Sequence, residues 1–103
     1  MGLARLSPDG ATTYLGQMRD AWADSIVVVD GWAVVSVPAH SCGIKTHRLF
    51  AAATSGQGGF VLIADGLVTP AALGADGVTF VNAAQQLVAI SKADLDLALA
   101  AGP

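Results

Sequence analysis

Apolar runs separated by sharp turn signals dominate the pattern of this chain. The clearest run covers residues 25–37, where two stretches rich in β-branched side chains flank the pair Asp30-Gly31. Asp-Gly between apolar stretches is a strong signal for a β-hairpin, because glycine adopts positive φ without a Cβ clash. Both stretches are apolar at successive positions, which predicts two strands covered on both faces. We expect Pro38, which has no N–H to donate, to end the second strand.

The same turn signal recurs along the chain. All eight acidic residues are aspartate, and glycine directly follows four of them, namely Asp9, Asp30, Asp65 and Asp76. Asp tolerates turn conformations and bonds its own backbone, so these pairs indicate tight corners. Glutamate, which favours helices, is absent. The pattern therefore predicts short strands that fold back at sharp turns.

Other apolar runs predict the remaining strands. Strands are expected at residues 44–53, 60–64, 78–81 and 86–90, with a loop at 40–43, a turn at 54–59, and an irregular or edge segment broken by Pro70 at 67–73. The pair Asp65-Gly66 is expected to close the strand at 60–64.

The two ends of the chain give weaker signals. Residues 1–10 are expected to form an irregular lead-in. Tyr14, Leu15, Met18 and Trp22 follow at roughly helical spacing and predict a short helix, although the nearby glycine and threonines also suit a strand.

At the other end, residues 91–94 (Ser-Lys-Ala-Asp) resemble a capping box with Asp in the Glu position, which favours a C-terminal helix. Residues 94–99 alternate with period two, as a strand would, but the alanines favour the helix. The whole pattern predicts a single mainly β domain over 1–103. Its architecture would be a small β-barrel or β-sandwich of about six or seven short strands with one or two short helices.

Composition adds a prediction about partners. Charged residues make up only 13% of the chain and hydrophobic ones 53%, whereas soluble domains average about 25% charged. Many of the apolar residues are alanines, whose small side chains do not form large apolar surface patches. The remaining excess predicts a surface covered by other copies of the chain or by a partner. Five scattered Lys and Arg residues are too few for a phosphate-tracking face, so we expect no nucleic-acid partner.

Targeting signals and redox chemistry narrow the setting. The N-terminal segment is too short and too broken for a signal peptide. The most apolar window, 25–39, carries Asp30 at its middle and is too short to span a bilayer, so no membrane partner is expected. The single cysteine excludes an intrachain disulfide. These features predict a cytoplasmic product that is not secreted by a signal peptide.

The densest group of chemically capable side chains lies at residues 40–48. One hypothesis is a metal site with His40, Cys42 and His47 as ligands, because imidazole and thiolate are the ligands that zinc prefers. A second hypothesis is a minor hydrolase, in which one of these histidines activates Cys42 as a nucleophile. No carboxylate lies nearby in sequence to complete the metal site, and a chain of 103 residues has little room for a substrate cleft. The simpler interpretation is a polar loop with Cys42 as a small buried side chain.

The same segment and the aromatic residues also suggest contact surfaces. Lys45, His47 and Arg48 would suit an acidic protein partner or a phosphate. Trp22 and Trp32 would suit a subunit interface, or the stacking of sugars in a carbohydrate-binding module. We expect Trp32 to lie in the core and Trp22 at an interface. No motif here specifies a cofactor or catalysis, so neither is expected.

Two stretches, 51–66 and 77–90, carry a resemblance in style to small accessory virion proteins of tailed bacteriophages, of the capsid-decoration and head or tail adaptor kinds. The resemblance implies a β-barrel or β-tulip-like module, often trimeric, that sits on a capsid lattice in the virion after assembly in the host cytoplasm. It transfers no site residue. The leading hypothesis is thus a non-enzymatic structural module that self-associates and binds a larger protein assembly such as a capsid. The alternatives are a small ligand- or metal-binding domain and a carbohydrate-binding module.

Overall fold

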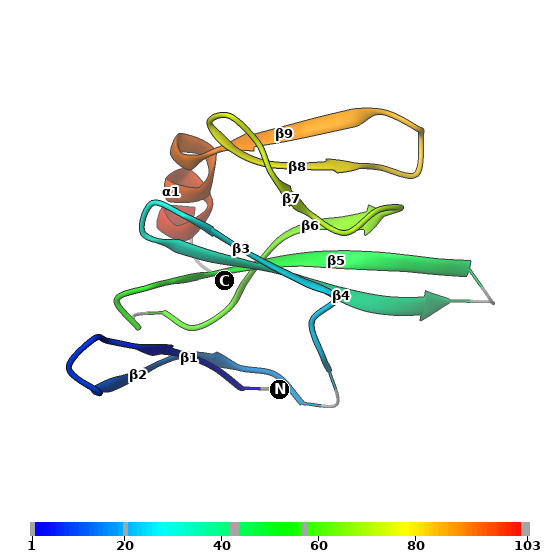
Figure 1. The fold of residues 1–103 in the computed structure, drawn as a ribbon. Helices are drawn as coiled ribbons and strands as arrows, with labels where there is room; N and C mark the ends of the chain where they lie inside the picture. The colour runs from blue at the N-terminus through cyan, green and yellow to red at the C-terminus, as the bar shows by residue number, and fades with distance from the viewer. Residues whose placement is uncertain (1, 20, 42–43, 57, 102–103) are drawn as a thin grey trace.

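The mainly β fold class is confirmed. The computed structural model describes residues 2–19, 21–41, 44–56 and 58–101. The elements are β1 (Gly2–Leu6), β2 (Thr12–Gln17), β3 (Ser25–Val29), β4 (Trp32–Ser41), β5 (Ile44–Ala53), β6 (Val61–Leu67), β7 (Ala72–Leu73), β8 (Gly77–Val81), β9 (Leu87–Ser91) and α1 (Lys92–Ala101). The strands form three antiparallel sheets, ordered β1-β2, β3-β4-β5-β6 and β7-β8-β9 (Figure 1).

The predicted hairpin at the start of the central sheet is confirmed. Val29 of β3 pairs with Trp32 of β4, which leaves Asp30 and Gly31 as a two-residue turn. Gly31 has a φ of 86°, a conformation that a Cβ disfavours. The turn therefore forms where the sequence places it.

The expectation that Pro38 ends its strand is wrong, because β4 continues to Ser41 and Pro38 pairs with His47 of β5. The neighbouring strand β3 begins at Ser25, opposite Ser36. Pro38 lies beyond that point, where β4 has no partner on the β3 side. The missing N–H interrupts no ladder there, since proline is tolerated on an edge. Residues 40 and 41 of the expected loop at 40–43 therefore belong to β4, and residues 42 and 43 lie outside the described part.

The N-terminal predictions are also wrong. Residues 2–6 form a strand instead of an irregular lead-in, and residues 12–17 form a second strand instead of a helix. Gly10, with a φ of 90°, makes the turn between them. Gly16 explains the preference for the strand, since a Cβ there would lie 2.6 Å from the ring of Phe60. The glycine lets β2 lie flat against the rest of the molecule.

The pair Asp65-Gly66 does not close its strand as expected. Strand β6 runs through it to Leu67, and Gly66 has a φ of 72°. The register between β5 and β6 shifts in this region, between His47 and Leu49. A glycine with positive φ inside a strand is the local geometry of a bulge, which bends a strand instead of reversing it. The same dipeptide therefore makes a turn at Asp30 and a bend at Asp65.

The C-terminal helix and its capping box are confirmed. The backbone N–H of Ser91 donates to Oδ2 of Asp94 at 3.1 Å, and the N–H of Asp94 donates to Oγ of Ser91 at 3.2 Å. The indole Nε1 of Trp32 donates to Oδ1 of Asp96 at 2.9 Å, which fastens α1 to the central sheet. Leu95 is fully buried between them.

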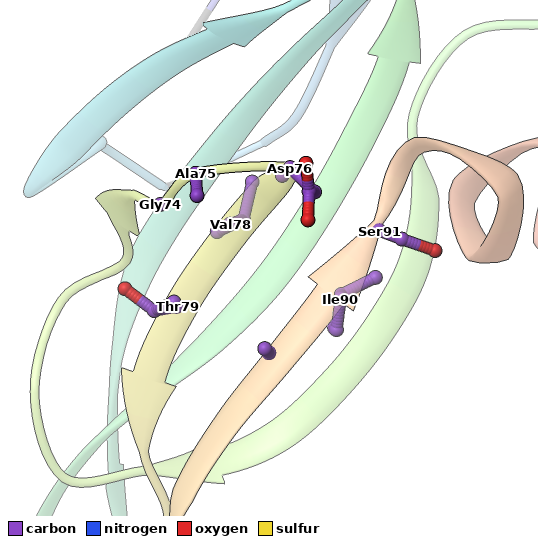
Figure 2. Close-up of a pocket in the computed structure, with 9 residues that line it drawn as sticks. Gly74, Ala75, Asp76, Val78, Thr79, Ile90 and Ser91 are labelled. Atoms are coloured by element: carbon purple, nitrogen blue, oxygen red, sulfur yellow. The ribbon is translucent and has the colours of Figure 1, made fainter.

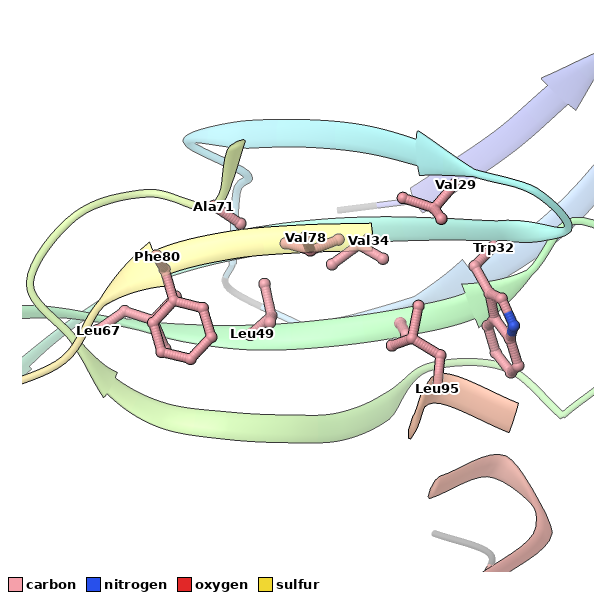
Figure 3. Close-up of a cluster of buried hydrophobic side chains, with 10 residues drawn as sticks. Val29, Trp32, Val34, Leu49, Leu67, Ala71, Val78, Phe80 and Leu95 are labelled. Atoms are coloured by element: carbon pink, nitrogen blue, oxygen red, sulfur yellow. The ribbon is translucent and has the colours of Figure 1, made fainter. Parts of the chain in front are cut away.

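The main core lies between the central sheet, the sheet β7-β8-β9 and α1. It is formed by Val29, Trp32, Val34, Leu49, Ala51, Leu67, Ala71, Val78, Phe80 and Leu95 (Figure 3). Buried β-branched and leucine side chains from all three layers meet in it, so removal of any one layer would open the core. The helix of the described residues is too short to cross a membrane.

Candidate interaction surface

The central sheet β3-β4-β5-β6 has two faces with different cover. Successive side chains of a strand point to opposite faces. Val34 and Leu49 therefore point to the face that packs against β7-β8-β9 and α1, which we call the inner face. Ala33 and Ala52 point to the opposite, outer face, where they pack against Leu15 of the hairpin β1-β2. The hairpin and the segment that follows it cover this outer face (Figure 1).

The cover of the outer face is incomplete. Ile26 and Val28 pair with Val35 and Ala33, so their side chains point to the outer face, and they are 55% and 65% exposed. Leu62 of β6, opposite Phe50, lies on the same face and is 53% exposed. Both edge strands of the sheet thus present large apolar side chains to solvent on one side.

This result corrects the expectation that both strands of the first hairpin are covered on both faces. Residues 32–37 of β4 are all buried, as expected for a central strand. Strand β3 is buried only toward the inner face, through Val29, while Ile26 and Val28 face outward. The edge position of β3 explains the difference, because the hairpin β1-β2 does not extend over it fully.

A groove of about 360 Å³ separates the hairpin from β3. Its walls are mostly aliphatic, with Leu3 and Leu15 on the hairpin side and Ile26, Val28 and Ala33 on the sheet side. Arg5 is the one charged residue among those that line it. A concave, apolar surface with one cationic group suits an apolar side chain from a protein partner.

A second hollow of about 360 Å³ lies on the outer face, where the C-terminal half of β4 pairs with β5. Arg19 and Arg48 line it, together with Val37 and Phe50. Nε of Arg48 lies 3.5 Å from Oδ2 of Asp65, and both side chains are more than half exposed. Such an exposed ion pair contributes little stability, which leaves Arg48 able to exchange Asp65 for an acidic partner.

The structure separates the polar residues that the sequence groups together. Arg48 points to the outer face, whereas its neighbour His47 points inward and is only 4% exposed. Nδ1 of His47 lies 2.8 Å from Oδ2 of Asp24. This separation is that of an ion pair, but the orientation does not satisfy hydrogen-bond geometry. His47 is buried against Asp24 and is therefore not available to a partner.

The other predicted interface residues fall in different places. Trp32 is buried in the main core, as expected, so it offers no surface to a partner. Trp22 is 63% exposed in the segment between β2 and β3, where it remains a candidate for contact with a partner or a sugar. The side chain of Lys45 lies outside the described residues.

The metal and nucleophile hypotheses remain predictions. Within the described part of the chain, no three His, Cys, Asp or Glu side chains gather where they would hold a metal ion. Cys42 and the side chain of His40, which both hypotheses use, lie outside that part. The contact of His47 with Asp24 shows that this histidine already has one neighbouring carboxylate, supplied by a residue distant in sequence.

A third hollow, of about 340 Å³, lies at the turn between β7 and β8 and beside β9 (Figure 2). Asp76 is the only ionisable side chain that lines it. Its walls are otherwise small or aliphatic side chains, such as Ala75, Val78 and Ile90, together with Thr79 and Ser91. A single carboxylate with two hydroxyl groups supplies neither an acid–base pair nor a positioned nucleophile and base.

The outer-face residues Ile26, Val28, Leu62, Arg5 and Arg19 were not singled out by the sequence. The period-two pattern does not distinguish a covered strand face from an open one, since both are apolar. The one available signal was the shortage of charge, which predicts an apolar surface but not its position. Comparisons with protein families, with curated proteins and with solved structures gave no match.

Proposed function

We propose that this protein is a non-enzymatic structural module that self-associates and binds a larger protein assembly. The observation that carries the proposal is the half-covered outer face of the central sheet. Ile26 and Val28 stay exposed at an apolar groove on one edge strand, and Leu62 stays exposed on the opposite edge strand. Exposed apolar surface of this kind marks protein contact sites. A hollow with two arginines at its end adds a polar rim of the type that accompanies an apolar interface core.

The energetics favour association by many weak contacts. Full burial of a Val, Leu or Ile side chain gains about 1.5–3 kcal/mol, so burying the exposed half of each gains about 1 kcal/mol. Three such residues supply only part of an interface, and the groove and the arginines would supply the rest. Contacts of this strength become stable when copies bind several neighbours at once.

The larger assembly that we propose is a virion capsid, with the protein as a decoration or accessory subunit. Support comes from the resemblance in style to tailed-phage accessory proteins and from the layered β architecture, which we take as a small sandwich and not a closed barrel. Trp22, which is 63% exposed in the segment between β2 and β3, provides further apolar surface for contact with the lattice. Binding only to the assembled lattice would stabilise it by mass action.

The test of self-association is the solution mass measured by light scattering over a concentration series. We expect a defined oligomer that dissociates on dilution, and Val28→Glu should lower its association constant at least tenfold. The matched control is Leu87→Glu, since Leu87 is 75% exposed on β9 and lies away from the outer face. A wild-type protein that stays monomeric at high concentration would overturn the proposal.

The virion version needs its own measurement, which is co-sedimentation of the purified protein with capsid shells assembled from tailed-phage major capsid proteins. Saturable binding at a fixed number of copies per capsomer would support a decoration role. A protein that oligomerises but binds none of the shells would remove the capsid from the proposal and leave the assembly module.

A further inference from the structure

The few cations of this chain are concentrated on one side of the molecule. The exposed residues Arg5, Arg19 and Arg48 line the groove and the hollow of the outer face. They are three of the five Lys and Arg residues in a chain with a net charge of −3. Asp65, at 3.5 Å from Arg48, is the only acid that forms an ion pair with any of the three within the described residues. Among the described residues, the outer face therefore combines an apolar groove with three arginines, one of which is paired with Asp65.

Three of the eight acids lie around the helix, on the other side of the central sheet. Asp76, Asp94 and Asp96 are all exposed there. One cation, Lys92, lies among them, with Nζ 3.8 Å from Asp96 and its backbone N–H bonded to the carbonyl of Asp76 at 3.3 Å. We call this surface, together with Leu97, the helix surface.

The helix surface also carries an exposed apolar side chain. Leu97 is 69% exposed and lies three residues after Asp94, so both side chains share one side of α1. The buried neighbour Leu95 shows that the helix is oriented with its other side toward the core. The helix surface therefore has the opposite charge to the outer face and an apolar side chain of the size that the groove admits.

We infer that copies of this protein associate head to tail, with the helix surface of one copy docked on the outer face of the next. Leu97 would enter the apolar groove beside Val28, while the acids around it approach the arginines. The inference deepens the proposed self-association and rests on it. Because the two contacting surfaces differ, the contact is heterologous, and repeated copies form a ring where the rotation between neighbours closes and a filament where it does not.

Charge distinguishes this arrangement from the symmetric alternative. Two outer faces packed against each other would bring Arg5, Arg19 and Arg48 of both copies into one interface, and like charges at an interface oppose association. The head-to-tail arrangement instead places cations against acids. Opposite charges across an interface also select the correct partner surface and speed the encounter.

Two single variants test the inference when they are mixed. Val28→Glu places a negative charge on the outer face, opposite the acids of the docked copy. Leu97→Lys places a positive charge on the helix surface, opposite the arginines. Both positions are exposed, so the fold should persist, which circular dichroism and thermal unfolding of each variant would verify.

For head-to-tail association, each variant alone should fail to form the wild-type oligomer. An equimolar mixture should form a complex that contains the two variants in a one-to-one ratio, since Val28→Glu keeps an intact helix surface and Leu97→Lys keeps an intact outer face. Light scattering on a size-exclusion column, with one variant carrying a fluorescent label, would measure its mass and composition. Raising sodium chloride to about 0.5 M should weaken the mixed complex, because screening shortens the range of charge attraction.

Two other outcomes would contradict head-to-tail association. If Leu97→Lys alone retains the wild-type mass, or if the folded variants fail to form a mixed complex, the helix surface is not the partner and the inference fails. Proposed self-association would survive both results, provided that the wild-type protein is an oligomer. A monomeric wild type would overturn the proposed function itself.

Discussion

The inner and outer faces of the central sheet are built from similar residues but have different surroundings. On the inner face, Val34 and Leu49 are fully buried beneath the sheet β7-β8-β9 and α1. On the outer face, the equally apolar Ile26 and Val28 remain more than half exposed beside the two-stranded hairpin. Strand propensity is therefore the same on the two faces, and the cover supplied by distant segments decides which one becomes core.

This difference separates two contributions that an apolar residue can make, one to the stability of the fold and one to association with a partner. A side chain on the inner face contributes to the free energy of unfolding, because it leaves water when the chain folds. An exposed one on the outer face contributes little until something else covers it. Substitutions on the two faces should therefore divide into those that change stability and those that change association.

The largest effect is expected on the inner face. Leu49→Ala removes a fully buried side chain from the main core, beside Phe80 and Val34. The lost transfer free energy and the cavity together should lower the free energy of unfolding by about 3 kcal/mol. Urea unfolding followed by tryptophan fluorescence would measure it. A loss below about 1 kcal/mol would show that this face is not the tightly packed one.

Next comes the contact that holds the hairpin on the outer face. A side chain at Gly16 would collide with the ring of Phe60, since even a Cβ would lie 2.6 Å from it. We expect Gly16→Val to lower the free energy of unfolding by about 2 kcal/mol, as for other overpacking changes. It should also increase amide exchange in β1 and β2. The matched control is Gly2→Val in the same hairpin, because a Cβ at Gly2 meets nothing within 4 Å; equal losses in both variants would contradict the packing argument.

How far the sequence predicts this fold depends on how local each signal is. The hairpin turn at Asp30-Gly31 and the capping box of α1 are decided by a few neighbouring residues, and both are confirmed. The bend at Asp65-Gly66 uses the same dipeptide as the turn, so local chemistry did not separate the two. Strand β2 was mistaken for a helix because its partner β1 and the contact of Gly16 with Phe60 come from elsewhere in the chain.

The candidate surface was less predictable than the fold, for the same reason. Residues 40–48 form a group only in sequence, since adjacent strand positions alternate between faces and send His47 inward and Arg48 outward. The arginines that do share a face, Arg19 and Arg48, are 29 positions apart and meet only through the path of the chain after β2. No spacing rule connects them.

A smaller effect is expected at the capping box, which begins helix α1 over the inner face. Ser91→Ala removes the hydroxyl that accepts the N–H of Asp94 at 3.2 Å. Loss of an N-terminal cap should lower the free energy of unfolding by about 1 kcal/mol. Thermal unfolding would measure it, and Ser91→Asn, which restores an accepting oxygen, should recover most of the loss. Failure of Ser91→Asn to do so would mean that the hydroxyl has a role other than capping.

The smallest effect on stability, and the most direct comparison of the two faces, comes from one substitution made on each. Val28→Thr replaces a methyl by a hydroxyl on the exposed outer face. Measured where the protein is monomeric, it should change the free energy of unfolding by less than about 0.5 kcal/mol, as for ordinary surface changes. The same change at the fully buried Val34 leaves a hydroxyl among apolar neighbours, which should cost about 1–3 kcal/mol.

Association should respond differently from stability at these two positions. Val28→Thr puts a polar group on the face that we propose for contact, so on dilution the oligomer should dissociate at a higher protein concentration than the wild type does. Val34→Thr, once folded, should keep the association of the wild type because Val34 has no exposed surface. If Val28→Thr destabilised the monomer as much as Val34→Thr does, Val28 would be buried in the folded monomer in solution. The argument for a partner on the outer face would then fail.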